Sequence, residues 1–146
     1  MRLFLTTLPL LLAAAPAGLT PGQWQLTSTP GTASLNGRPL GDLPYMAAAP
    51  ELVCVKATDF RDPAVWLSRD VPKNCTLTRR SVAGGRVDIA GTCAPQAPGL
   101  ARGTVRVTGR WTPTSYDLHF TTANPSENGV MGFTGTVTGR RLGACA

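Results

Sequence analysis

The chain has 146 residues, a formal net charge of +6 at pH 7, four cysteines and one histidine. This length fits one domain, and beyond its first residues no apolar stretch approaches the ~20 residues of a membrane helix. The charge favours anionic partners, but the arginines are dispersed singly, which is also typical of an ordinary solvated surface. We therefore expect neither a membrane span nor a nucleic-acid partner.

Residues 1–17 have the three parts of a secretory signal peptide. Met1-Arg2 is a short positive start, an apolar run follows, and Ala15-Pro16-Ala17 places small residues where a signal peptidase cleaves. The alternative is a buried N-terminal helix. The sequence therefore predicts cleavage near Ala17 and a periplasmic or secreted protein, with residues 18–146 forming a single antiparallel β domain.

The first elements of that domain follow from periodicity and capping residues. Apolar and polar residues alternate over 23–27, which predicts a strand with Trp24 and Leu26 facing inward. Residues 29–51 lack a clear period and are rich in Pro, Gly and Ala, so we interpret them as a long flexible loop. A short strand is expected over 52–56. Asp62 and Pro63 suit the cap and first position of a short helix, with Trp66 folded onto the sheet.

The four cysteines, in an exported chain, indicate two disulfide bonds, for which three connectivities are possible. Folding the chain about Gly84 brings Cys75 opposite Cys93. The same register places Arg80 opposite Asp88, a favourable cross-strand pair. This agreement favours the Cys75–Cys93 bond, which leaves Cys54 to pair with Cys145. Arg79, however, falls on the otherwise apolar face in this register.

Two further hairpins continue the pattern. Folding about residues 112–115 pairs Trp111 with Tyr116 and Val107 with Phe120. Folding about residues 125–128 pairs Phe120 with Phe133. Because a one-residue slip would turn every side chain to the other face, the shared inward row is evidence for a meander.

The predicted fold class is therefore all-β in the main, with one short helix and two disulfide bonds. Gly109, Gly135 and Gly139 lie inside the expected strands, where glycine often marks bends. They favour a curled antiparallel meander or a partial barrel with a concave apolar face. A flat sheet covered by residues 63–68 is the alternative.

Short motifs in a fixed order resemble the domain-of-unknown-function 3617 family of small exported proteobacterial proteins. That family opens with Pro-Gly-x-Trp and closes with a Gly-Arg-Arg-x-Gly-x-Cys type of ending, with cysteines between. Gln25 departs from the Glu that usually follows the Trp. The resemblance implies a periplasmic address and a β architecture, and it carries no assigned activity. The matching segments are Pro21-Gly22-Gln23-Trp24, Val53-Cys54-Val55, Asn74-Cys75-Thr76, Ala90-Gly91-Thr92-Cys93 and Thr134 to Cys145.

We expect a non-enzymatic binding or interaction module with no cofactor and no metal. An open apolar cavity would favour a hydrophobic or lipid-like ligand, whereas a packed interior would favour protein or polymer contacts. The alternative is a small envelope hydrolase that uses His119, which needs a nucleophile and an acid within reach. The candidate ligand-binding residues are Trp24, Trp111, Tyr116 and Phe120, and the candidate stripe for an anionic envelope component or partner is Arg102, Arg106 and Arg110.

Overall fold

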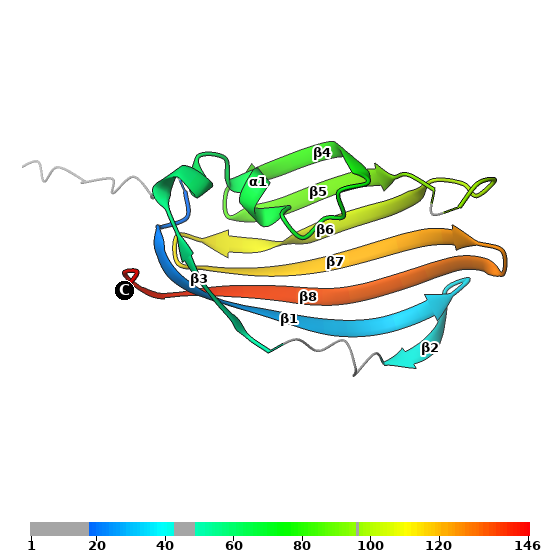
Figure 1. Cartoon of the computed structure of the whole chain (residues 1–146), viewed down its shortest axis with the longest axis horizontal. Helices are drawn as coiled ribbons and strands as arrows, with labels where there is room; N and C mark the ends of the chain where they lie inside the picture. Colours follow the sequence, from blue (N-terminus) through cyan, green and yellow to red (C-terminus); the bar gives the residue numbers. More distant parts are fainter. Residues whose placement is uncertain (1–17, 43–48, 96) are drawn as a thin grey trace, which may run out of the picture.

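The computed structural model describes residues 18–42, 49–95 and 97–146, and the predicted signal peptide lies outside them. It is built on one antiparallel sheet that is not closed, with one short α-helix, as the sequence predicts (Figure 1). Its elements are β1 (Gly22–Leu35), β2 (Arg38–Asp42), β3 (Glu51–Val55), η2 (Ala57–Phe60), α1 (Pro63–Leu67), β4 (Cys75–Ala83), β5 (Arg86–Cys93), β6 (Gly103–Thr112), β7 (Ser115–Ser126) and β8 (Gly129–Gly143).

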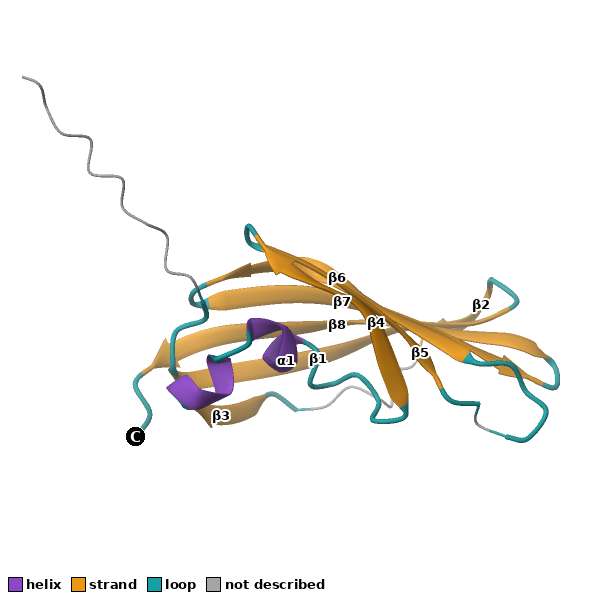
Figure 2. Cartoon of the chain, turned by 90° about the horizontal axis from the view of Figure 1, so that it is seen from above, coloured by secondary structure: helices purple, strands orange, loops and turns teal. Residues whose placement is uncertain are grey.

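The strands follow the order β2-β1-β8-β7-β6-β5-β4, and β3 also pairs with β1. Strands β4 to β8 are thus a meander, and β1 adds to its last strand. Seen from above, the sheet is curved, and η2 and α1 cover its inner face near one end (Figure 2). Among the residues that the structure describes, no helix has the length and hydrophobicity needed to cross a bilayer.

The two ends of the sheet differ. We call the end with turns 84–85 and 113–114 the closed end, because η2 and α1 cover it (Figure 1). The end with turns 36–37 and 127–128 is the open end. One disulfide bond lies at each end, and both connectivities are as predicted. Cys54–Cys145 ties β3 to the C-terminus at the closed end, and Cys75–Cys93 joins β4 to β5 toward the open end.

The core is thickest at the closed end. Trp24 is fully buried, stacks on Tyr116 with 5.9 Å between ring centroids, and meets Phe60 edge-on at 5.8 Å. Trp66 packs edge-on against Phe60 at 5.2 Å, so the predicted helix does fold onto the sheet. Asp62 caps it, because its Oδ1 accepts a hydrogen bond of 2.9 Å from the backbone N–H of Ala64.

The predicted loop over 29–51 is wrong for its first part. Strand β1 continues to Leu35, and β2 folds back on it after a tight turn at Asn36-Gly37. Both turn residues have positive φ, at 50° and 76°. Asn-Gly is the dipeptide that two-residue hairpin turns favour most, so the sequence did contain the signal. Residues 43–48 of the expected loop lie outside the described residues, and β3 confirms the strand expected over 52–56.

The β4–β5 hairpin keeps the predicted register only near its disulfide bond. Beyond Leu77, a β-bulge shifts the pairing by one residue. The predicted Arg80–Asp88 pair is therefore wrong. Arg79, misplaced in the unbulged register, donates to Asp88 at 2.8 Å instead. This hydrogen bond lowers the pKa of the Asp88 carboxyl below its usual value.

The hairpin at 112–115 has the predicted register throughout, including Val107 opposite Phe120. The hairpin between β7 and β8 is displaced by two residues, because its turn is only Glu127-Asn128. Phe120 therefore lies opposite Gly135 rather than Phe133. A Cβ atom at Gly135 would collide with the Phe120 ring, so the glycine makes room for the aromatic side chain.

Candidate functional site

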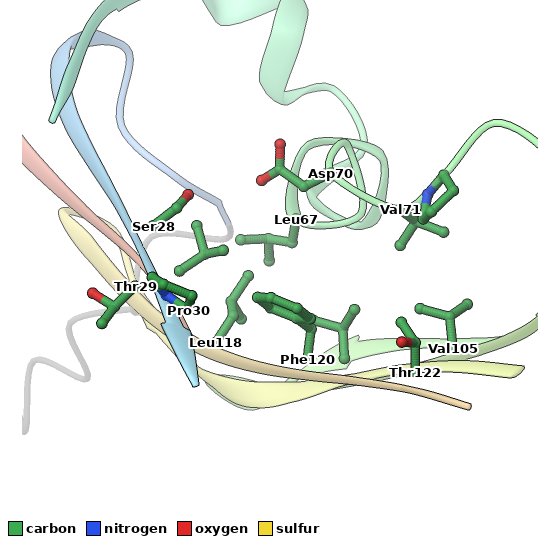
Figure 3. A pocket seen from close by; sticks show the side chains of 13 residues that line it. Ser28, Thr29, Pro30, Leu67, Asp70, Val71, Val105, Leu118, Phe120 and Thr122 are labelled. Atoms are coloured by element: carbon green, nitrogen blue, oxygen red, sulfur yellow. The ribbon is translucent and has the colours of Figure 1, made fainter. Parts of the chain in front are cut away.

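An apolar cavity of about 340 Å³ lies between the inner face of the sheet and the segment 67–72 (Figure 3). This volume is at the lower end of the range typical of small-molecule sites, roughly 300–1,000 Å³. The cavity adjoins the aromatic core of the closed end and extends toward the open end. Its walls come from β1, β6, β7, β8 and the segment that follows α1. The lining residues are Ser28, Thr29, Pro30, Leu67, Asp70, Val71, Pro72, Val105, Val107, Leu118, Phe120, Thr122 and Val137.

The floor of the cavity is a direct product of strand alternation. Val105 and Val107 of β6 point to the inner face, as do Leu118 and Phe120 of β7. Successive side chains of a strand point to opposite faces, so each strand delivers every second residue to this floor. Figure 3 shows Leu118, Phe120, Val105 and Thr122 on the sheet side, with Leu67 and Val71 facing them.

The roof depends on how α1 ends. The Ser68 hydroxyl donates to the carbonyl of Ala64 at 2.6 Å, and the backbone N–H of Val71 donates to the carbonyl of Ser68 at 3.0 Å. This turn brings Leu67 and Val71 over the sheet. Pro72 has no backbone N–H to continue the hydrogen-bonded turn, and the chain then leads into β4. The roof is thus a short irregular segment with apolar side chains turned inward.

Among the described residues that line the cavity, one is ionisable. Asp70 lies at the upper rim of the cavity, on the side of Ser28, above the apolar side chains (Figure 3). The neighbouring Arg69 does not line the cavity. Its guanidinium group lies 4.4 Å from the Trp66 ring centroid, 3.6 Å from Asp70 and 3.7 Å from Glu51. Asp70 and Glu51, which does not line the cavity, therefore share the one guanidinium group of Arg69.

The four aromatic residues proposed from the sequence do not form one surface. Phe120 lines the cavity, whereas Trp24 and Tyr116 belong to the packed core of the closed end. Trp111 packs against that same core. Burial raises the pKa of the Tyr116 hydroxyl to about 12, which keeps it neutral. Sequence reasoning missed the roof, although Val71-Pro72 is an apolar pair among polar residues just after the predicted helix.

His119 is exposed on the outer face of β7, where its Cα partners are Thr108 and Thr136. Among the described residues, no hydrogen bond or ion pair joins it to an acid or to a hydroxyl nucleophile. The same part of the chain contains no group of three or more His, Cys, Asp or Glu side chains that could hold a metal ion.

The three stripe arginines are all exposed, and β6 presents Arg106 and Arg110 on its outer face. Arg106 pairs with Asp88 at 3.2 Å and lines a shallow outer hollow together with several threonines. Arg110 lies directly opposite Arg86 of β5. Asp117, its Cα partner on β7, pairs instead with Arg140 at 3.4 Å. Arg102 immediately precedes β6.

The family can be assigned from the whole domain. The family model described as "Protein of unknown function (DUF3617)" matches residues 19–145. This chain is a member of the DUF3617 family. The match confirms the resemblance seen in the motifs, and it covers every strand described above. No curated protein and no solved structure matches the chain. DUF3617 membership therefore brings no activity with it, and the function has to be inferred from the cavity and the surface.

Proposed function

We propose that this protein is a non-enzymatic binding module that holds a small hydrophobic molecule in the cavity between its sheet and the segment 67–72. The observation that carries the proposal is the cavity itself. Nine of its 13 described lining residues are Pro, Leu, Val or Phe, and the one ionisable residue among them, Asp70, lies at the rim. Ligand pockets typically combine apolar walls with a few placed polar groups.

We also propose that the protein acts outside the reducing cytoplasm, after removal of residues 1–17. Two disulfide bonds and no free cysteine among the described residues support this location, since such bonds persist in oxidising compartments. Peptide sequencing of the N-terminus of the protein isolated from its native host would test it, with Gly18 expected as the first residue.

The cavity proposal is tested by filling the site. The probe is N-phenylnaphthylamine, an uncharged apolar molecule whose fluorescence reports its binding. Val71→Phe adds volume at the roof, and we expect it to lower the affinity for this probe roughly tenfold. Val65→Phe is the matched control, because Val65 lies on α1, is 50% exposed and does not line the cavity. Val105→Phe, which fills the cavity from the sheet, should act like Val71→Phe. Equal probe binding by all of these variants would contradict the proposal.

A second candidate function is contact with an anionic envelope component through Arg102, Arg106 and Arg110. The observation that favours it is the Arg86–Arg110 cross-strand pair, since like charges directly opposite are unfavourable without an anion nearby. Neither residue forms an ion pair with a carboxylate in the described part of the chain. Arg106→Glu with Arg110→Glu should abolish retention on immobilised polyphosphate. Unchanged retention would dispose of this candidate.

A further inference from the structure

We propose that the molecule held in the cavity is a cationic amphiphile, whose aliphatic chain occupies the apolar interior and whose ammonium head lies at Asp70. This inference rests on the proposed function and adds the chemical class of the ligand. It follows from the charge of the described lining residues, among which the one ionisable side chain is a carboxylate.

The apolar interior of the cavity favours a ligand with an aliphatic chain. Apart from the Thr122 side chain on the sheet side, the floor and roof present branched aliphatic side chains, one phenyl ring and two prolines. No polar or charged residue is buried in the described part of the chain. A charged group placed in the interior would lose its hydration without gaining an oppositely charged partner. The charged part of any ligand therefore has to remain at the rim.

The residues at the rim determine which charge the head group of the ligand should carry. Asp70 is the only ionisable residue among the described residues that line the cavity, and its side chain is 59% exposed, so it keeps access to water and to a ligand. The Ser28 hydroxyl lies on the same side of the cavity and can accept a hydrogen bond (Figure 3). A carboxylate and a hydroxyl oxygen together suit an ammonium group, which has three donors and no acceptor.

The same rim disfavours an anionic head such as that of a fatty acid. Such a head would face Asp70, and the described part of the cavity lining has no lysine or arginine to offset the repulsion. Arg69 is near, but Glu51, Asp70 and the Trp66 ring already surround its guanidinium group. The positive net charge of the whole chain acts at longer range and is screened by salt.

The test compares three ligands that share one chain and differ only in the head: dodecylammonium, dodecanol and dodecanoate. In the assay, each ligand competes with bound N-phenylnaphthylamine on the disulfide-bonded protein, at ligand concentrations below the critical micelle concentration of that ligand. We expect dodecylammonium to bind up to about fivefold more tightly than dodecanol, the limit for a solvent-exposed ion pair. Dodecanoate should bind more weakly than dodecanol.

Asp70→Asn should remove the preference for dodecylammonium over dodecanol. Asp117→Asn is the matched control, because its carboxylate is similarly exposed, pairs with an arginine and lies on the outer face of the sheet. It changes the net charge equally and should leave the preference intact. Dodecanoate binding as tightly as dodecylammonium, or an unchanged preference in Asp70→Asn, would overturn the assignment of the head group alone. Failure of all three ligands to displace the probe would overturn the proposed function as well.

Discussion

The two ends of the sheet carry the same alternating pattern but are buried to very different degrees. At the closed end, Trp24, Leu26 and Tyr116 are each less than 5% exposed. At the open end, the inward residues Met131 and Phe133 are only half-buried. The difference arises because η2, α1 and the segment after them cover only one part of the inner face. Strand alternation thus creates an apolar face, and a covering segment decides how much of it becomes core.

The cavity lies at the transition between these two regions. Toward the closed end, the aromatic side chains of η2 and α1 fill the space above the sheet. Beyond Leu67, the cover consists of smaller side chains on an irregular segment, and space remains. The cavity therefore arises here because the covering segment becomes thinner, without any change in the sheet below.

The largest expected loss of stability comes from removing the two disulfide bonds, one of which lies at each end. Replacing Cys54 and Cys145 by Ser opens a loop with a sequence separation of 91, and should cost about 4 to 5 kcal/mol. Replacing Cys75 and Cys93, with a separation of 18, should cost about 3 kcal/mol. Urea unfolding of both double variants measures these costs. If removing the Cys75–Cys93 bond cost more free energy of unfolding than removing Cys54–Cys145, the stabilisation would not originate in loop entropy.

Truncation of apolar side chains should have the next largest effect on stability, and the loss should differ between the two ends. Trp24→Ala removes a fully buried side chain at the closed end, and should lower the free energy of unfolding by about 4 kcal/mol. Phe133→Ala at the open end should cost less than about 2 kcal/mol, because its side chain is already partly hydrated. Equal losses in thermal or urea unfolding would mean that the open end is covered in solution.

The smallest expected effect is the titration of Tyr116 under the covering segment. Burial raises the pKa of its hydroxyl to about 12 from an ordinary value of 10.0. The neutral form is therefore favoured by folding, and this contribution is complete below pH 10 and is lost as the pH rises toward 12. Difference absorbance of tyrosinate between the wild type and Tyr116→Phe measures this pKa, with Tyr45 present in both proteins. An ordinary pKa would indicate that water reaches the closed end.

The sequence was sufficient for the fold class and for most strand positions, but it could not determine every register. A shift of two residues keeps each side chain on its face, so polarity alone does not distinguish Phe133 from Gly135 as the partner of Phe120. The fit of an aromatic ring over a glycine decides between them. At β4, the one sign of a bulge was Arg79 on the apolar face, a misfit that the bulge resolves.

The site was less accessible to prediction than the fold. The floor residues could be assigned to the inner face from alternation, and Phe120, one of the four proposed ligand-binding aromatic residues, does line the cavity. The roof could not, because the path of residues 68–72 depends on turns and packing that have no period. Whether an apolar face is filled or left with a cavity depends on the volumes of side chains from distant segments, as at Trp24 and Val71.

The position of the cysteines has a consequence for how the proposed ligand would enter the cavity. Cys54 and Cys75 bracket the covering segment, and each is bonded to another part of the domain. With both of its ends covalently fastened, the segment cannot swing outward about either one. We expect exchange of the proposed ligand to involve outward bowing of the stretch between α1 and β4, around Asp70 and Val71. Amide hydrogen exchange should accordingly be fastest in the middle of the span and slowest beside the two bonded cysteines.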